Sequence, residues 1–163
     1  MQIAYLIDHA VHVSELARLH FQEWSYLRQG ESLEGRTARL LACCGRNAIP
    51  TVVVALEAEQ LLGSALLVAQ DLESRPHLTP WLAGVFVKAQ HRGRGIGTRL
   101  IQRIEAEARW LGTTNLYLYT SSTQTLYQRL GWSVMERCGY RGTDVAVMSK
   151  SLAAQARSDL QQA

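Results

Sequence analysis

The stretch QHRGRGIG at residues 90–97 constrains the fold more than any other part of the chain. It lies between Trp81–Val87, an apolar run typical of a strand, and Thr98–Leu111, where apolar residues recur at helical spacing. Glycines at alternate positions remove the Cβ atoms that would hold a bulky group away from the backbone. The start of the following helix has free N–H groups that attract anions. The segment therefore predicts a phosphate-binding loop between a strand and a helix.

Size and composition indicate a single globular domain. The chain has 163 residues, of which 47% are hydrophobic and 19% charged, and its net charge is +3. We expect one domain over residues 1–152 and a C-terminal tail at 153–163. No apolar run is long enough to cross a membrane, and the N-terminus MQIAYLIDHA has no signal-peptide profile, so we expect a cytoplasmic protein.

The cysteines point neither to disulfides nor to a metal site. There are three, an odd number without a C-x-x-C pair, which argues against a disulfide framework and against zinc. The adjacent Cys43 and Cys44 are interpreted as buried helical thiols. We therefore expect no metal.

The spacing of apolar residues predicts a mixed order of strands and helices. Helices are expected at His12–Leu27, Ser32–Cys44 (with Gly45 as its C-cap), Thr98–Leu111 and Thr123–Leu130. Strands are expected at Gln2–Ile7, Thr51–Leu56, Leu61–Gln70, Trp81–Val87, Asn115–Thr120, Trp132–Cys138 and Asp144–Ser149. The order β-α-α-β-β-β-α-β-α-β-β predicts an α+β fold with three α/β/α layers, in which a mixed sheet has helices on both faces.

Several classes of protein place a glycine-rich loop between a strand and a helix. A P-loop requires a lysine, and none lies between Arg92 and Ile104. The dinucleotide fingerprint G-x-G-x-x-G is not matched, and the acid expected about 20 residues later falls in the apolar segment Asn115–Leu118. A nucleic-acid module would use the two loop arginines, but the chain has no other basic stripe. A plain tight turn with solvated arginines remains open.

Two segments resemble the GNAT superfamily of N-acetyltransferases. Arg92, Gly95 and Gly97 match its cofactor motif (Q/R)-x-x-G-x-(G/A). Leu126–Trp132 resembles its Y-x-x-x-G-F segment, with tryptophan at the usual phenylalanine. The resemblance covers most of the chain and is strongest over Val85–Trp132. It implies the acyl-CoA N-acyltransferase fold, with a mostly antiparallel sheet of about seven strands.

The resemblance also implies an activity and a site. The domain at 1–152 would transfer an acetyl group directly from acetyl-CoA, its co-substrate, to a primary amine. Tyr127 would be the general acid for the departing thiolate. The strand before the loop would splay from its neighbour and pair with the pantetheine arm, while the loop N–H groups hold the pyrophosphate. The implied cofactor-binding residues are Val85, Phe86, Val87, Arg92, Gly93, Arg94, Gly95, Ile96, Gly97, Thr98 and Thr120.

The general base and the acceptor pocket are less defined. The family's strand glutamate has no counterpart in Pro80–Gly84. Candidate bases are His77, Glu73 and Asp71 in the preceding loop, and His20 and Glu23 on the first helix. His20 falls on the apolar helix face, where a histidine is more often a hydrogen-bonded core residue. Candidate pocket residues are Phe21, Trp24, Tyr26, Trp81, Tyr140, Glu23, Glu31 and Asp144.

A second class of function stays open. A catalytically inactive CoA-binding regulatory or sensor domain on the same fold would explain the missing strand carboxylate, although the retained Tyr127 opposes it. The expected partners are a small-molecule or peptide amine, with no nucleic acid and no membrane. Since the family is often dimeric, the resemblance also implies a homodimer.

Overall fold

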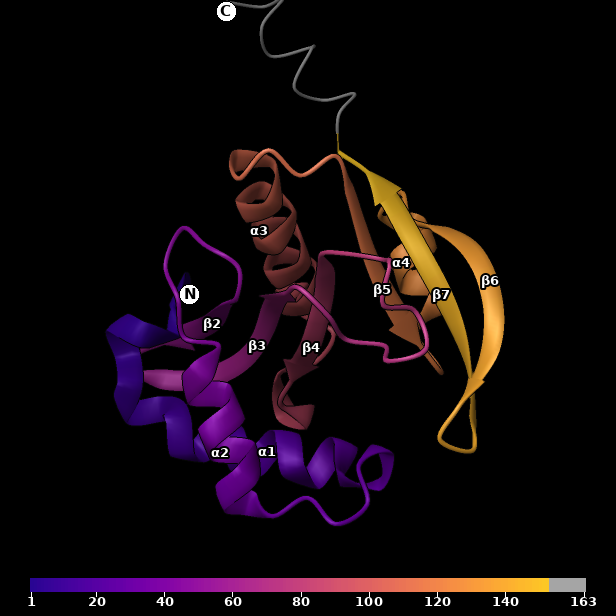
Figure 1. Cartoon of the computed structure of the whole chain (residues 1–163). Helices are drawn as coiled ribbons and strands as arrows, with labels where there is room; N and C mark the ends of the chain where they lie inside the picture. Colours follow the sequence, from indigo (N-terminus) through magenta and orange to yellow (C-terminus); the bar gives the residue numbers. More distant parts are fainter. Residues whose placement is uncertain (153–163) are drawn as a thin grey trace, which may run out of the picture.

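Seven strands, hydrogen-bonded in the order β1-β2-β3-β4-β5-β7-β6, form the centre of the computed structural model (Figure 1). The structure describes residues 1–152, so the tail expected at 153–163 lies outside the described residues. All neighbouring strands are antiparallel except β4 and β5, which are parallel. The strands are β1 (Gln2–Tyr5), β2 (Thr51–Glu57), β3 (Gln60–Val68), β4 (Trp81–Val87), β5 (Asn115–Thr120), β6 (Ser133–Tyr140) and β7 (Thr143–Ser151).

Helices cover both faces of the sheet, as Figure 1 shows. The helices are α1 (Val13–Trp24), α2 (Leu33–Ala42), α3 (Ile96–Trp110) and α4 (Gln124–Arg129). α3 and α4 pack on one face with the larger apolar core, and α1 and α2 pack on the other with a second core. A third apolar cluster forms where the loop at 69–80 covers β4, β5 and β7. The predicted three-layer α/β/α fold with a mixed, mostly antiparallel sheet is therefore confirmed.

Several predicted boundaries were wrong by a few residues. β1 ends at Tyr5 because a 3-10 segment, η1 (Leu6–His12), follows it and buries Leu6 completely. α1 ends at Trp24, and the last predicted residues form a short 3-10 turn, η2 (Ser25–Leu27).

The end of α2 also differs from the prediction. Its C-cap is Cys43, not Gly45, while the Ser32 hydroxyl caps its start by accepting from the Gly35 N–H at 2.9 Å. Cys43 and Cys44 are half-buried and follow the last helical residue, so their interpretation as buried helical thiols was wrong. The helix ends two residues earlier than its apolar spacing predicted, so both thiols follow the helix and pack, half-buried, against the second core.

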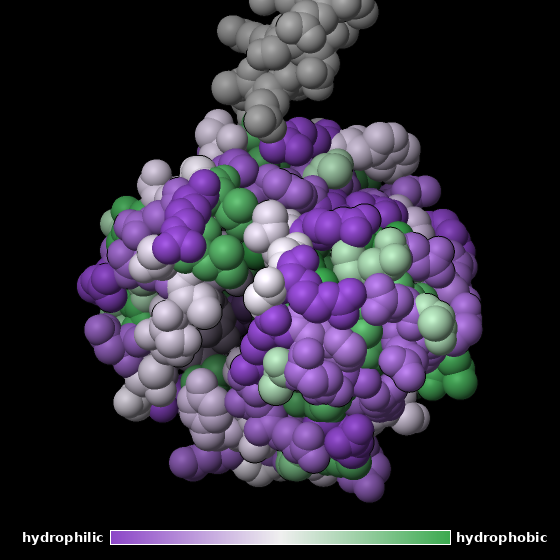
Figure 2. All heavy atoms as spheres, turned by 180° about the vertical axis from the view of Figure 1, so that it is seen from behind, coloured by the Kyte–Doolittle hydropathy of each residue, from purple (hydrophilic) through white to green (hydrophobic). Residues whose placement is uncertain are grey.

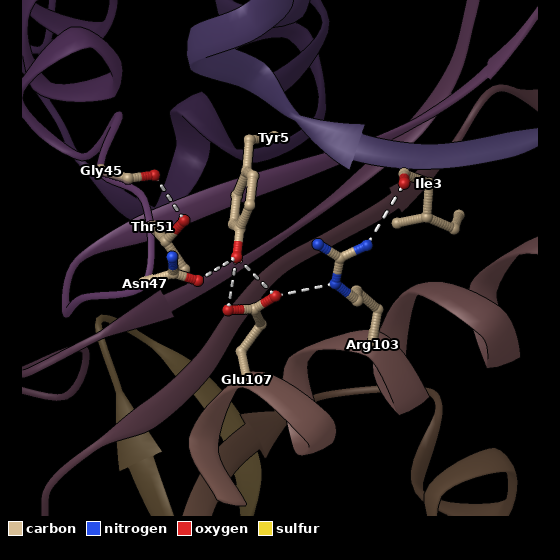
Figure 3. Close-up of polar contacts among 7 residues, drawn as sticks. All are labelled: Ile3, Tyr5, Gly45, Asn47, Thr51, Arg103 and Glu107. Atoms are coloured by element: carbon tan, nitrogen blue, oxygen red, sulfur yellow. Dashed lines mark hydrogen bonds and ion pairs between the residues drawn. The ribbon is translucent and has the colours of Figure 1, made fainter. Parts of the chain in front are cut away.

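A polar network fixes α3 against β1 (Figure 3). The Tyr5 hydroxyl lies 2.8 Å from one Glu107 carboxylate oxygen and 2.8 Å from the Asn47 side-chain oxygen. The Arg103 guanidinium donates to Glu107 at 2.8 Å and to the Ile3 carbonyl at 3.2 Å. Glu107 is buried, so these partners satisfy a carboxylate that would otherwise be costly to desolvate. The network holds the axis of α3, and hence its N-terminus, relative to the sheet.

The reverse face of the molecule is mostly hydrophilic. Figure 2 shows apolar groups there in small separate areas and a hollow near the middle of the face. Within residues 1–152, no helix is both long enough and apolar enough to cross a membrane.

Candidate active site

The two parallel strands at the centre of the sheet separate along their length. β4 and β5 are bridged only at Trp81 and Tyr117, near the start of β4. From Leu82 onward the edge of β4 that faces β5 has no ladder partner, whereas β5 pairs with β7 along its opposite edge over its whole length. The splaying that the resemblance implies is therefore present in the fold.

A β-bulge lies on the other edge of β4. Ser64 pairs with Phe86 and Leu66 with Ala83, so Gly84 and the residue after it stand opposite a single residue of β3. Gly84 has φ +56°, and a Cβ built on it would come within 2.5 Å of the Leu66 side chain. The bulge needs glycine for both reasons.

A buried histidine supports this bulge. The Ser64 hydroxyl donates to the Gly84 carbonyl at 2.9 Å, and His20 Nε2 lies 2.8 Å from the same hydroxyl. With its hydrogen on Nε2, the imidazole donates to Ser64. Burial, followed by the charges of Arg36 and Arg39, lowers the pKa of His20 from 6.5 to about 3. His20 is thus a neutral, hydrogen-bonded core residue. This is the role that its position on the apolar face of the helix indicated.

This burial predicts a pH dependence of stability. The folded chain leaves His20 unprotonated down to about pH 3, whereas the unfolded chain protonates it below 6.5. The contribution of His20 to the free energy of unfolding is complete above pH 6.5. It is lost as the pH falls toward 3, by about 1.4 kcal/mol per pH unit. Chemical denaturation at several pH values should therefore show a shallower acid slope for His20→Gln than for wild type. Replacing the exposed His77 by Gln is the control; equal slopes for wild type and His20→Gln would contradict the prediction.

The glycine-rich loop leaves the start of α3 open. Gly95 is the N-cap of α3, with φ +75°, and no side chain caps the helix. The first intrahelical bond runs from the Arg99 N–H to the Gly95 carbonyl at 3.2 Å. The N–H groups of Ile96, Gly97 and Thr98 therefore lack intrahelical partners and point out of the helix start, where its dipole is positive. A helix start of this kind can accept hydrogen-bonding anions.

Both loop arginines contact protein groups. Arg92 donates from Nε to the Val87 carbonyl at 2.9 Å, which ties the loop to the end of β4. Arg94 forms an exposed ion pair with Glu57 at 3.1 Å, so part of its charge is offset. An anion at the helix start would meet mainly backbone N–H groups.

Tyr127 lies on α4, on the β5 side of the opening between the two strands. Its side chain is only 7% exposed and packs edge-on against Trp132, with ring centroids 6.1 Å apart. Burial raises the pKa of Tyr127 to about 12, although a hydrogen bond with Thr123 lowers it in part. The Thr123 hydroxyl lies 2.8 Å from that of Thr120, so the Thr120 side chain is held in a local hydroxyl network. Tyr127 thus carries its proton throughout the neutral range.

A pocket of about 620 Å³ extends between these strands toward α1 and α2. Its walls include nine residues singled out from the sequence: His20, Glu23, Trp24, Tyr26, Asp71, Val85, Thr120, Tyr127 and Tyr140. Phe86 to Thr98 do not line it. The structure thus brings Tyr127, Thr120 and Val85 around one pocket and places the loop beyond the end of β4.

Several expected pocket residues lie elsewhere. Phe21, Trp81 and Asp144 do not line the pocket, and neither do His77 and Glu73. Trp81 is completely buried and donates from its indole N–H to the Leu78 carbonyl at 2.6 Å, because the loop at 69–80 folds over it. Glu31 lines an adjoining hollow and forms ion pairs with two arginines of α2.

Among the pocket residues that were not predicted are three arginines and a tyrosine: Arg28, Arg36, Arg39 and Tyr119. The two helical arginines are three residues apart, so they share one face of α2, and this spacing was a signal available in the sequence. Tyr119 sits in the NLYLYT strand, where alternation gives no sign of which face borders a pocket.

Comparisons with known proteins agree with this geometry. A family model described as "Acetyltransferase (GNAT) domain" matches residues 48–134. No curated protein matches the sequence significantly.

Solved structures share the fold at low sequence identity. An aminoglycoside 6'-N-acetyltransferase complexed with coenzyme A has a TM-score of 0.72 and 17% identity, covering 93% of this chain and 97% of its own. The aminoglycoside 6'-N-acetyltransferase from Enterococcus faecium has a TM-score of 0.69 and 18% identity, with the same coverage. A ribosomal-protein-alanine N-acetyltransferase from Brucella melitensis has a TM-score of 0.64 and 21% identity, covering 93% and 99%. With a family model that matches more than half of its length, this chain belongs to the GNAT family of acetyltransferases.

Proposed function

We propose that the protein transfers an acetyl group from acetyl-CoA directly to the primary amine of a small molecule or peptide. The observation that carries the proposal is the opening between β4 and β5, which has a free strand edge on one side and the protonated Tyr127 on the other. A pantetheine arm carries amide groups that can pair with a strand edge, and its thioester would then lie beside a proton donor. A purely structural core would require neither the unpaired edge of β4 nor a tyrosine hydroxyl beside it.

The proposed cofactor site uses backbone more than side chains. The N–H groups at the start of α3 would hold the pyrophosphate, with Gly93, Gly95 and Gly97 leaving room for it. The free edge of β4 from Val85 to Val87 would hold the pantetheine arm, and an N–H group there would polarise the thioester carbonyl. The pocket from α1 and α2 would then receive the amine.

The chemistry needs a proton acceptor as well as a donor. Attack requires a neutral amine nitrogen, and collapse of the tetrahedral intermediate needs a proton on the sulfur. Tyr127 would supply that proton. Of the acids in the pocket wall, Asp71 is suited to accept the proton from the ammonium form of the amine, because burial raises its pKa to about 7. Amine acylation is also the reaction named for the structural neighbours above, which supports nitrogen as the acceptor atom.

Binding and turnover together test the proposal. Acetyl-CoA is titrated calorimetrically, and thiol release is then followed in the same samples with a panel of amino acids, polyamines, aminoglycosides and short peptides. We expect saturable binding and thiol release that depends on the amine. Binding without thiol release for any amine would favour the sensor alternative, and absence of binding would overturn the proposal.

A further inference from the structure

Three arginines face the pocket that would receive the amine. Arg36 and Arg39 extend from one face of α2, and Arg28 comes from the segment between η2 and α2. Arg28 and Arg39 also line an adjoining open hollow of about 510 Å³. Arg28 and Arg39 therefore lie between the pocket and an opening to solvent, and Arg36 lines the pocket beside them.

A single carboxylate forms ion pairs with this arginine cluster. Glu31 lies 3.1 Å from Arg36 and 2.8 Å from Arg39. Within residues 1–152, the Arg28 side chain has neither a hydrogen bond nor an ion pair. The buried Nε atoms of Arg36 and Arg39 also lack hydrogen-bond partners in the described part of the chain. Buried polar groups in proteins are nearly always paired, so these two Nε donors point to a missing acceptor, although the buried Glu31 Oε2 in the same cluster also lacks a hydrogen bond within the described residues.

The charges of the cluster act on one another and on their surroundings. Burial, and then the charges of Arg28 and Arg36, lower the pKa of Arg39. Burial raises the pKa of Asp71 to about 7, although all three arginines act in the opposite direction. At neutral pH, Asp71 therefore offsets the cluster only in part. Glu23, the other acid of the pocket wall, is an exposed residue of α1. The cluster retains positive charge that no protein group within residues 1–152 neutralises.

We propose that the acceptor amine carries an anionic group, a carboxylate or a phosphate, that binds to Arg28 together with Arg36 and Arg39. A guanidinium is a planar fork that matches either group through two parallel hydrogen bonds. This inference rests on the proposed function, because it concerns the acceptor of that reaction. Amines without an anionic group, including polyamines and aminoglycosides, would meet like charge at this wall.

Matched pairs of amines test the inference. Amino acids are compared with their C-terminal amides, and O-phosphoethanolamine with ethanolamine, so that the two arms separate carboxylate from phosphate. We expect kcat/KM to be at least about tenfold higher for the anionic member of one pair. Arg28→Gln should remove that preference while leaving the Kd of acetyl-CoA unchanged. Arg18→Gln, which removes the same charge from an exposed position on α1, should keep it.

The outcomes separate this inference from the function on which it rests. If acetyl-CoA does not bind, the proposed function fails. If acetyl-CoA binds and both members of every pair react equally, or if Arg28→Gln keeps the preference, the anionic acceptor is overturned and the function stands. If no amine reacts, the CoA-loaded protein is titrated with inorganic phosphate and with acetate by NMR. Binding that is weakened about tenfold in Arg28→Gln but not in Arg18→Gln supports the inference, and absence of such binding overturns it.

Discussion

Replacing Tyr127 by Phe is expected to lower kcat for acetyl transfer by about 100- to 10,000-fold, the range typical of losing a general acid. The change removes one oxygen atom from a side chain that is only 7% exposed and leaves its ring against Trp132. Cofactor binding should therefore be preserved within about threefold, since the loop and the β4 edge are untouched. Thiol release at saturating amine and calorimetric titration with acetyl-CoA measure the two quantities separately.

The raised pKa of Tyr127 predicts how the rate of the wild-type protein depends on pH. Because burial raises the pKa of Tyr127 to about 12, the phenol keeps its proton well above the pKa of an ordinary tyrosine. The rate should not fall on the alkaline side as far as about pH 10.

The matched control for Tyr127→Phe is Tyr117→Phe on β5, which should change kcat little. The Tyr117 ring packs 5.9 Å from that of Trp81. A loss of less than about threefold in Tyr127→Phe would mean that another group or water protonates the sulfur.

Replacing Gly95 by Asp is expected to weaken acetyl-CoA binding by at least about 100-fold. The change places a carboxylate at the open N-terminus of α3. There it can accept hydrogen bonds from the N–H groups proposed to hold the pyrophosphate, and its charge would repel the pyrophosphate. A Cβ on Gly95 would meet no atom within 4 Å, so the loss would not come from a steric clash within the protein. Aspartate also tolerates a positive φ better than most residues. Calorimetric titration with acetyl-CoA measures the effect.

The other end of the same helix offers a control for this variant. Gly112 follows α3 with φ +82°, and a Cβ on it would likewise meet no atom within 4 Å. Gly112→Asp therefore carries the same backbone strain and the same added charge, far from the loop. It should bind acetyl-CoA like wild type, and circular dichroism of both variants should show the wild-type fold. Equal weakening in the two variants would mean that the cofactor phosphates bind somewhere other than the start of α3.

Local sequence patterns were sufficient for the fold and for the loop. The alternation and spacing of apolar residues place Trp81–Val87 and Asn115–Thr120 at their observed bounds. They place the start of the helix after the loop at Thr98, two residues later than the observed start at Ile96. These features depend on neighbours within a few residues, which a single sequence contains. The predicted start of the next helix at Ser32 is also local, because the Ser32 hydroxyl caps α2 through the Gly35 N–H.

Features that depend on distant contacts were not predictable. His20 and Ser64 are 44 residues apart, and their hydrogen bond follows from how α1 lies on β3. The Arg28 side chain joins those of α2 only because the turn before that helix brings it to the same wall. Trp81 was assigned to the pocket from its aromatic character, but the fold of the preceding loop encloses it. The positions of these side chains are set by tertiary packing, and single-sequence patterns do not report it.

The single bridge between β4 and β5 also has a thermodynamic consequence. The sheet consists of two antiparallel ladders, β1 to β4 and β5 to β7, that share one pair of residues, Trp81 and Tyr117. A molecule lodged in the wedge between them contacts both ladders, and it binds the folded chain but not the unfolded one. By linkage, its binding free energy adds to the stability of the whole sheet and opposes separation of the two ladders. The gap in the sheet thus lets a bound molecule reinforce the packing of α3 and α4 that already joins the two ladders.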